Sequence, residues 1–209
     1  MRGQLITLEG PEGAGKSTQL KLLAAKLESQ GYQVICTREP GGGGSLSEKL
    51  RELLLSPDTG KISIGAELFL ILAARSEHME NVILPGLRKG AFVLCDRFID
   101  STLAYQGYGR GIALEMIKTL NRFAIRGRFP DLTVIFDISP EEGLVRAGKD
   151  STLDRIEGEE LSFHHKVRDG FLALSEESSR YYVVDSNQSV DAVFAEIWDR
   201  FKRLIPDEN

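Results

Sequence analysis

The chain has 209 residues, 42% of them hydrophobic and 27% charged, which suits one α/β domain with a full core. Its formal net charge of -5 argues against a protein that follows a nucleic-acid backbone, because such proteins carry a basic excess. The longest apolar run, residues 68–74, is too short to span a bilayer. We therefore expect a single domain over residues 1–209, with neither a nucleic-acid polymer nor a membrane as its partner.

Short apolar segments alternate with longer segments of helical period along the chain. Segments rich in Val, Ile, Leu and Phe predict five strands, at residues 4–9, 33–38, 91–96, 132–138 and 181–185. Helical periodicity predicts helices at residues 17–30, 47–55, 66–88, 114–126, 141–147, 160–176 and 190–204. This alternation predicts a three-layer α/β sandwich, in which helices cover both faces of a parallel sheet.

A glycine-rich loop follows the first predicted strand and precedes the first helix. It fits the pattern G-x-x-x-x-G-K-[ST] in the setting that this pattern requires. The residues expected to bind ATP are Gly10, Pro11, Glu12, Gly13, Ala14, Gly15, Lys16, Ser17 and Thr18. Backbone N–H groups and the helix N-terminus would face the phosphates. Lys16 is expected to act on the β- and γ-phosphates as a catalytic cation, and Ser17 to bind Mg²⁺.

Charged residues stand at the ends of the second and third predicted strands. Arg38 and Glu39 follow the second strand and Asp96 and Arg97 the third, and such strand ends border the ligand crevice. A helix and a glycine-rich loop add two more arginines, Arg75 and Arg110. A surface ion pair is the alternative for any one arginine, but the group predicts a second phosphate-bearing substrate. Asp96 is expected to hold Mg²⁺ or its water shell, or else to pair with Arg97.

Other classes of P-loop protein carry signatures that this sequence lacks. It has no Asn-Lys-x-Asp and no Asp-x-x-Gly after the third strand, as a GTPase would, and no Leu-Ser-Gly-Gly-Gln of a transporter ATPase. A phosphate acceptor is already anionic, so its phosphorylation needs alignment and charge neutralisation more than a general base. Two alternatives remain: a deoxynucleoside kinase, which would need a base, and a nucleotide-binding scaffold protein without turnover.

Four blocks of the sequence resemble bacterial thymidylate kinases. They are residues 9–18, residues 37–42 (Thr-Arg-Glu-Pro-Gly-Gly), residues 96–111 (Asp-Arg-Phe through Gly-Arg-Gly) and residues 154–157 (Asp-Arg-Ile-Glu). The resemblance implies the nucleoside monophosphate kinase fold with five parallel strands, and a homodimer. It also implies transfer of the γ-phosphate of MgATP to dTMP, which gives dTDP for dTTP biosynthesis.

The resemblance implies roles for individual residues on the phosphate and sugar side of the acceptor. Arg97 would contact the acceptor phosphate, with Arg38 near it, and Glu12 would meet the sugar 3′-hydroxyl. The full dTMP site that we expect is Glu12, Arg38, Glu39, Pro40, Ile71, Arg75, Arg97, Ser101, Thr102, Tyr105 and Gln106.

Base recognition falls by the same resemblance to a second group of residues. Arg75, Ser101 and Thr102 would read the base, because buried donors left unpaired by a wrong base discriminate well. Tyr105 would pack near the sugar, where a ribose 2′-hydroxyl would clash, and Gln106 would lie close by.

Two positions depart from the family pattern. The family has Phe four residues before the helix arginine, whereas this chain has Ile71, with Phe69 as the nearest aromatic residue. Either side chain is a candidate to cover the thymine. Family members with an acid and no arginine in the glycine-rich loop usually supply catalytic cations from the lid, the segment before Asp-Arg-Ile-Glu. Here the lid, expected at about residues 148–155, carries one lysine in its middle. Lys149 is thus the expected catalytic lid cation, followed by Arg155 and Arg146, although a lysine cannot make the forked contact of arginine.

Two further expectations follow from single residue types. His78, His164 and His165 have neither a paired carboxylate nor metal-ligand spacing, so we expect solvated or half-packed helix positions. The N-terminal segment lacks the apolar stretch of a signal peptide, and two cysteines are too few for a disulfide framework. These features predict a cytoplasmic protein.

Overall fold

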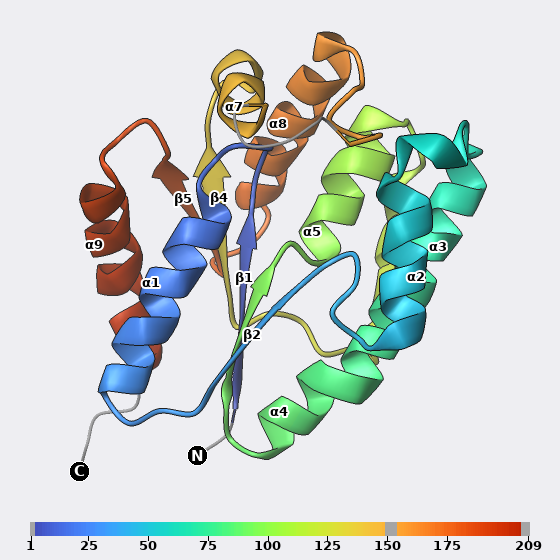
Figure 1. Cartoon of the computed structure of the whole chain (residues 1–209). Coiled ribbons are helices and arrows are strands. Elements are labelled where there is room, and N and C mark those ends of the chain that lie inside the picture. The colour runs from blue at the N-terminus through green and yellow to red at the C-terminus, as the bar shows by residue number, and fades with distance from the viewer. Residues whose placement is uncertain (1–2, 149–153, 206–209) are drawn as a thin grey trace.

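One parallel sheet organises the chain, of which the computed structural model describes residues 3–148 and 154–205 (Figure 1). The strand order is β2-β3-β1-β4-β5. The strands are β1 (Gln4–Glu9), β2 (Val34–Arg38), β3 (Phe92–Asp96), β4 (Leu132–Asp137) and β5 (Tyr181–Asp185). All five predicted strands are confirmed.

Helices cover both faces of this sheet. They are α1 (Lys16–Ser29), α2 (Ser45–Leu55), α3 (Ile64–His78), α4 (Leu84–Arg88), α5 (Ile99–Thr102), α6 (Leu114–Ala124), α7 (Pro140–Ala147), α8 (Leu161–Ser175) and α9 (Val190–Phe201). Short 3₁₀ turns occur at Pro57–Thr59 and Lys202–Leu204. In Figure 1, α1 and α9 lie together on one side of the sheet, and α2, α3, α4 and α5 lie on the other. The predicted three-layer sandwich is confirmed. Among the described residues, no helix has the length and apolar character needed to cross a membrane.

Alternating side chains of the central strand β1 fill the core on both faces. Ile6 and Leu8 pack in a cluster with residues of α1 and α9, whereas Leu5 packs with Met79 and Ile83 on the opposite face. This period of two is that of a strand buried on both sides.

The register of the sheet brings the charged strand ends together. Asp96 at the end of β3 is paired with Leu8 of β1 and with Arg38 of β2. Because all three strands are parallel, the loops that follow them open at one edge of the sheet. The glycine-rich loop, Arg38 and Arg97 therefore meet at this edge.

The helix predicted at residues 66–88 is confirmed, but it is not α-helical throughout. A π-helical turn, Met79–Ile83, separates α3 from α4. Pro85 lies just beyond this turn and has no backbone N–H, so it cannot donate the hydrogen bond that continues an α-helix.

The stretch before Arg110 is helical, whereas its glycines led us to expect a loop. α5 continues into a π-helical segment, Leu103–Gly109, which packs against α8. A Cβ at Gly109 would lie 2.5 Å from the ring of Phe163, and one at Gly170 would lie 2.7 Å from Tyr108. Glycine thus allows close packing of the two helical segments, which outweighs its low helix propensity.

Candidate active site

The glycine-rich loop turns tightly between β1 and α1. Gly10 and Gly13 have φ angles of 133° and 65°, and a Cβ at either would lie 2.4 Å or less from a backbone oxygen. Only glycine fits these two positions. The buried Lys16 donates from Nζ to the carbonyl oxygens of Gly10 at 3.1 Å and Pro11 at 2.6 Å. Its ammonium group therefore lies against the loop whose backbone N–H groups are suited to bind phosphate.

The two expected magnesium ligands are in contact. Ser17 donates from Oγ to Oδ2 of Asp96 at 2.6 Å. Mg²⁺ prefers oxygen ligands and is often held by one or two protein groups together with phosphates and water, so this pair of side chains fits it. Clusters of three or more metal-ligating side chains are absent from the described part of the chain. The alternative pairing of Asp96 with Arg97 is not observed among these residues, because Arg97 bonds elsewhere.

A cavity of about 350 Å³ opens beside the loop. The eleven residues expected to bind dTMP all line it: Glu12, Arg38, Glu39, Pro40, Ile71, Arg75, Arg97, Ser101, Thr102, Tyr105 and Gln106. Residues that we did not predict complete the wall, namely Arg51, Leu54, Leu55, Glu67, Phe98, Asp154, Ile156 and Glu157. A cavity of this size suits a small-molecule ligand.

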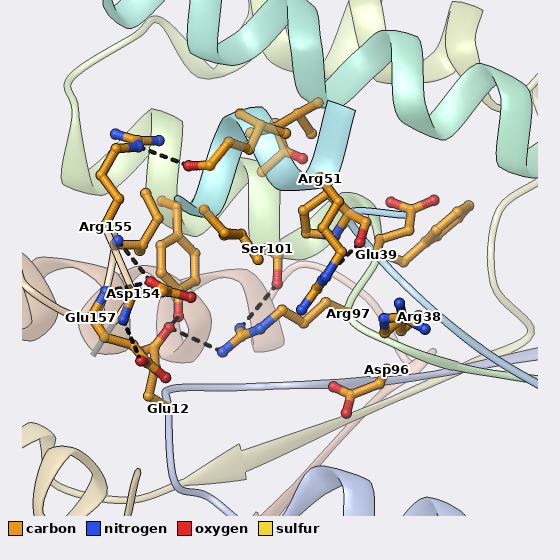
Figure 2. A pocket seen from close by; sticks show the side chains of 18 of the residues that line it. Glu12, Arg38, Glu39, Arg51, Asp96, Arg97, Ser101, Asp154, Arg155 and Glu157 are labelled. Carbon is orange, nitrogen blue, oxygen red and sulfur yellow. Dashed lines mark hydrogen bonds and ion pairs between the residues drawn. The ribbon is translucent and has the colours of Figure 1, made fainter. Parts of the chain in front are cut away.

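The guanidinium groups of Arg38, Arg51 and Arg97 come from different elements and reach the same side of the cavity (Figure 2). Arg38 pairs with Glu48 at 2.9 Å, and Arg51 of α2 donates to the carbonyl oxygen of Pro40 at 2.8 Å. Burial, together with the neighbouring Arg38, lowers the pKa of Arg51. No local motif marks Arg51, since arginine is common on the face of an amphipathic helix. Arg51 reaches the cavity because α2 packs beside the segment that follows β2.

The backbone at Arg97 has a left-handed conformation with φ of 64°, which is uncommon for a residue other than glycine. Its N–H donates to the carbonyl oxygen of Leu8 at 2.9 Å. Glu9 holds the next residues, because its carboxylate accepts from the N–H of Phe98 at 2.7 Å and from Oγ of Ser101 at 2.6 Å. Burial, with nearby Asp100, raises the pKa of Glu9. The sequence marks this residue only as an acid at the end of a buried strand.

The guanidinium of Arg97 lies against the glycine-rich loop. It donates to the carbonyl oxygen of Gly10 at 2.8 Å, to Oε1 of Glu12 at 3.1 Å and to Oγ of Ser101 at 3.3 Å. Oε1 of Glu12 also accepts from the hydroxyl of Tyr105. Burial alone would raise the pKa of Glu12, but Arg97 and the other donors outweigh it and lower the pKa to about 2. Glu12 is therefore an ionised acceptor.

The expected environment of the histidines is wrong for two of them. His78 is fully buried, with Nδ1 at 3.0 Å from Glu39 and Nε2 at 2.6 Å from Oγ1 of Thr37. His164 is 2% exposed and faces Glu12. His165 is exposed, as expected. Local spacing does not reveal the two buried histidines, because their partners come from other elements.

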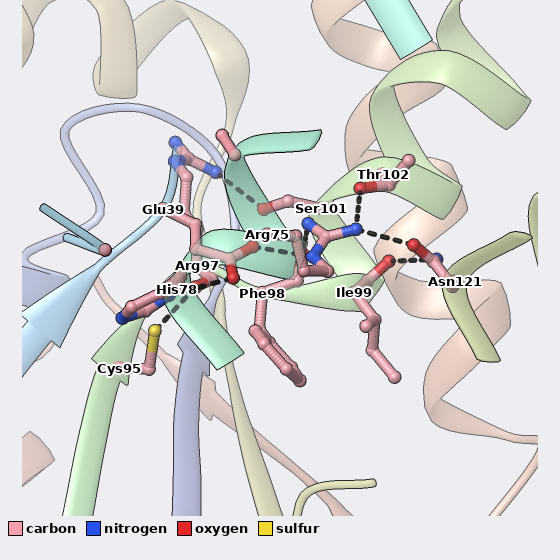
Figure 3. Close-up of polar contacts among 12 residues, drawn as sticks. Glu39, Arg75, His78, Cys95, Arg97, Phe98, Ile99, Ser101, Thr102 and Asn121 are labelled. Carbon is pink, nitrogen blue, oxygen red and sulfur yellow. Dashed lines mark hydrogen bonds and ion pairs between the residues drawn. The ribbon is translucent and has the colours of Figure 1, made fainter. Parts of the chain in front are cut away.

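Nearly all hydrogen-bond donors of the Arg75 guanidinium are satisfied within the protein (Figure 3). Its Nε donates to Glu39 at 2.7 Å, and its Nη1 donates to Thr102 at 2.8 Å and to Asn121 at 2.5 Å. Its Nη2 donates to the carbonyl oxygen of Phe98 at 3.0 Å. Four of the five N–H groups of a guanidinium are thus engaged within the described residues, and one remains.

Ile71 and Phe69, the two candidates to cover a base, lie in different environments. Ile71 lines the cavity. Phe69 is 64% exposed and is not part of the cavity wall, as expected for side chains two positions apart on a helix. Ile71 is therefore the apolar side chain of this pair that can contact a bound base.

The expected lid cations lie in different places. Arg155 lines the cavity, where its Nε donates to the carbonyl oxygen of Leu54 and its Nη2 to Glu67, both at 2.7 Å (Figure 2). Arg146 instead bonds to the loop after β5. Lys149 falls outside the described residues.

Arg110 does not join the cations of the cavity. It pairs with Glu67 at 3.2 Å and with Glu159 at 2.7 Å, and its guanidinium stacks over the ring of Phe163 at 4.5 Å from the centroid. Its charge is used within the protein, and it is absent from the cavity wall.

Known proteins share both the sequence and the fold of this chain. A family model described as Thymidylate kinase matches residues 8–197. The thymidylate kinase of Pseudomonas putida is 49% identical over 198 residues, which are 94% of each chain, and that of Exiguobacterium sp. is 44% identical over 200 residues, 95% of this chain and 94% of the relative. The crystal structure of thymidylate kinase from Ehrlichia chaffeensis, 35% identical, superposes with a TM-score of 0.78 and covers 97% of this chain and 99% of that one. The chain therefore belongs to the thymidylate kinase family, the nucleoside monophosphate kinases that phosphorylate dTMP to dTDP.

Proposed function

We propose that this chain aligns the γ-phosphate of ATP with the phosphate of dTMP at the boundary between the glycine-rich loop and the cavity. The observation that carries the proposal is the convergence of Arg38, Arg51 and Arg97 in a cavity that also contains Lys16. Four cations are more than one nucleotide requires, and an acceptor phosphate explains them. Because its oxygen is already anionic, transfer depends on alignment and charge neutralisation.

On the donor side, residues 10–18 bind the phosphates of ATP. The backbone N–H groups of the loop hold the phosphate oxygens, and Lys16 leaves its carbonyl partners to meet the β- and γ-phosphates. Ser17 and Asp96 hold Mg²⁺ or its water shell. When bound, this ion neutralises charge on the phosphates.

On the acceptor side, Arg97 is the principal ligand of the dTMP phosphate. Its guanidinium is already oriented by Glu12 and Ser101, so little reorganisation is needed when the acceptor binds. Arg38 and Arg51 neutralise the remaining charge. Oε2 of Glu12, which Arg97 leaves free, accepts from the sugar 3′-hydroxyl.

The base and sugar lie deeper in the cavity. Ile71 covers the thymine ring, and Arg75 with Thr102 forms the polar wall that reads its edge. Tyr105 packs beside the sugar, where it limits the space for a ribose 2′-hydroxyl. The wall is completed by Glu39, Pro40, Ser101 and Gln106.

Residues 1–209 form one domain, in which about residues 148–155 act as the lid. Lys149 is the lid cation that acts on the transferred phosphoryl group, with Arg155 as the second candidate. The bonds of Arg155 to Glu67 and Leu54 favour a role in holding the root of the lid.

A homodimer in the cytoplasm completes the proposal, without a nucleic-acid polymer or a membrane as partner. Its support is the apolar surface of α3 and α6, which pack against each other. Phe69 of α3 is 64% exposed, and Phe123 and Met116 of α6 are 85% and 56% exposed. Large exposed apolar side chains of this kind are typical of an interface.

The function is tested by the release of ADP from MgATP with dTMP, dUMP, thymidine and other monophosphates offered in turn. We expect turnover with dTMP and none with thymidine, which lacks the phosphate that the arginines bind. Turnover with thymidine but not with dTMP would contradict the proposal. Absence of turnover with every acceptor would favour a nucleotide-binding scaffold.

A further inference from the structure

Glu67 occupies a position at the cavity that no sequence pattern assigned. It lies in the first turn of α3, and its side chain is 2% exposed. Its carboxylate accepts from the amide of Gln106 at 2.9 Å, from Arg110 at 3.2 and 3.3 Å, and from Arg155 at 2.7 Å. We propose that Glu67 orients the amide of Gln106 and thereby favours acceptor bases with a ring N–H beside an oxo group, as in thymine and uracil, over cytosine. The inference rests on the proposed function of the cavity as the dTMP site.

The ionisation state of Glu67 determines whether the NH₂ group or the carbonyl oxygen of Gln106 faces it. Burial alone would raise the pKa of Glu67, but hydrogen bonds from Gln106, Arg110 and Arg155 outweigh it and lower the pKa. An ionised carboxylate only accepts hydrogen bonds. Gln106 must therefore turn its NH₂ group toward Glu67, because its carbonyl oxygen there would place two acceptors against each other.

With its NH₂ group bonded to Glu67, the Gln106 amide has its carbonyl oxygen on the side away from Glu67. Gln106 lines the cavity, and within residues 3–148 and 154–205 this oxygen accepts no hydrogen bond. The oxygen is also not one of the buried atoms that lack a partner, so it is accessible and can accept from a donor on a ligand in the cavity. Gln106 thus offers the cavity an acceptor that Glu67 holds in one orientation.

Arg75 provides the complementary donor. Its one N–H not engaged by the described residues is on Nη2, and Arg75 lines the same cavity. A donor at Arg75 and an acceptor at Gln106 match the oxo oxygen and the ring N–H of thymine or uracil. Cytosine presents an amino group and a ring nitrogen lone pair instead, which sets donor against donor and acceptor against acceptor.

The test replaces Glu67 with glutamine and measures kcat/KM for dTMP and for dCMP. A glutamine offers either an oxygen or an NH₂ group to Gln106, so the amide of Gln106 loses its single orientation. We expect the preference for dTMP over dCMP to fall by about tenfold or more. If dCMP turnover is too slow, its inhibition constant against dTMP gives the same comparison. An unchanged preference, with both acceptors weakened in proportion, overturns the inference. Wild-type protein without dTMP turnover contradicts the proposed function itself.

Two further variants separate base reading from a structural role. Glu159→Gln removes the other carboxylate that pairs with Arg110, at 2.7 Å, and leaves the bond between Glu67 and Gln106 in place. It should keep the wild-type preference. Gln106→Met deletes the amide but keeps Glu67 with both of its arginines, and it should lose the preference. An unchanged preference in Gln106→Met overturns the inference even where Glu67→Gln does not fold.

Discussion

Nδ1 of His164 lies 3.7 Å from Oε2 of Glu12, the carboxylate oxygen that neither Arg97 nor Tyr105 engages. His164 comes from α8 and Glu12 from the glycine-rich loop, so this contact joins two distant parts of the chain. A protonated imidazole at this distance stabilises the carboxylate and limits its rotation. His164 thus helps to present Oε2 to the sugar 3′-hydroxyl in the proposed complex.

His164→Asn is expected to raise the KM for dTMP, with little change in kcat or in the KM for ATP. The reason is that Glu12 keeps Arg97 and Tyr105 but loses the cation at its second oxygen, and we expect an increase of about three- to tenfold in KM. With 3′-deoxythymidine monophosphate, which has no 3′-hydroxyl, the substitution should change KM little. His165→Asn, next along the helix, is the matched control. Equal losses with both acceptors would contradict this role.

The same pair predicts a pH dependence of stability. Burial would lower the pKa of His164, but Glu12 and the backbone carbonyls of Glu157 and Glu159 outweigh it and raise the pKa above its usual value. A raised pKa means that the stabilisation is fully present below the unfolded value and is lost as the pH rises through the folded one. The free energy of unfolding of wild type minus His164→Asn should therefore be larger at about pH 6 than at about pH 9. Urea titrations at the two pH values measure it, and equal differences would contradict it.

Arg97→Ala is expected to remove most dTMP turnover and to leave ATP binding intact. Arg97 lines the acceptor cavity with its guanidinium pre-oriented, and loss of such a group lowers kcat by about two to three orders of magnitude. Arg38→Ala should cost less, because Arg38 is half exposed and pairs with Glu48. Steady-state kinetics and calorimetric titration with ATP make the two measurements. Loss of ATP affinity in Arg97→Ala would show that the donor and acceptor sites are wrongly assigned.

The strands and the glycine-rich loop could be predicted from the sequence because their signals are local. Five apolar runs mark the buried strands, and the charged residues Arg38 and Arg97 stand directly at strand ends. The family resemblance added the deeper cavity residues, such as Tyr105. Partners brought together by tertiary packing carry no such local signal. Glu67 reads as an ordinary acid in the first turn of a helix, and its partner Gln106 lies 39 positions away.

Asp100→Asn is expected to lower the free energy of unfolding. Asp100 is fully buried and accepts from both terminal nitrogens of Arg180, at 2.7 and 2.9 Å, and from the hydroxyl of Tyr181 at 2.9 Å. Asparagine leaves the guanidinium without its counter-charge, which costs about 3 kcal/mol in buried pairs. Urea denaturation measures the change. Asp199→Asn, which removes an exposed carboxylate on α9, is the control and should leave stability unchanged. Equal stability of the two variants would show that Asp100 contributes nothing.

Lys149→Ala is expected to lower kcat by about a hundredfold and to leave the KM for dTMP near its wild-type value. A lid cation acts on charge that develops during transfer and therefore affects kcat more than ground-state binding. Lys149→Arg should keep most of the activity, since the positive charge remains. Arg146→Ala is the control, because Arg146 bonds to the loop after β5 and does not line the cavity. Rapid-quench measurement of the transfer step distinguishes these outcomes. A normal rate in Lys149→Ala would move the catalytic role to Arg155.

Phe123→Glu is expected to convert the proposed dimer to a monomer. Phe123 is 85% exposed on α6, beside α3 with its exposed Phe69, and a dimer would bury both rings. A buried, unpaired carboxylate at the centre of an apolar interface costs several kcal/mol, which is enough to dissociate a homodimer at micromolar concentration. Light scattering after size exclusion gives the mass of each variant. Val145→Glu is the control: Val145 is 61% exposed on α7, a helix outside the proposed interface of α3 and α6, and its substitution should leave the mass unchanged. A wild-type protein that is already monomeric, or a Phe123→Glu variant that remains dimeric, would mean that the apolar surface of α3 and α6 is not the interface. The kinase assay on the monomer then shows whether the cavity works without a partner subunit.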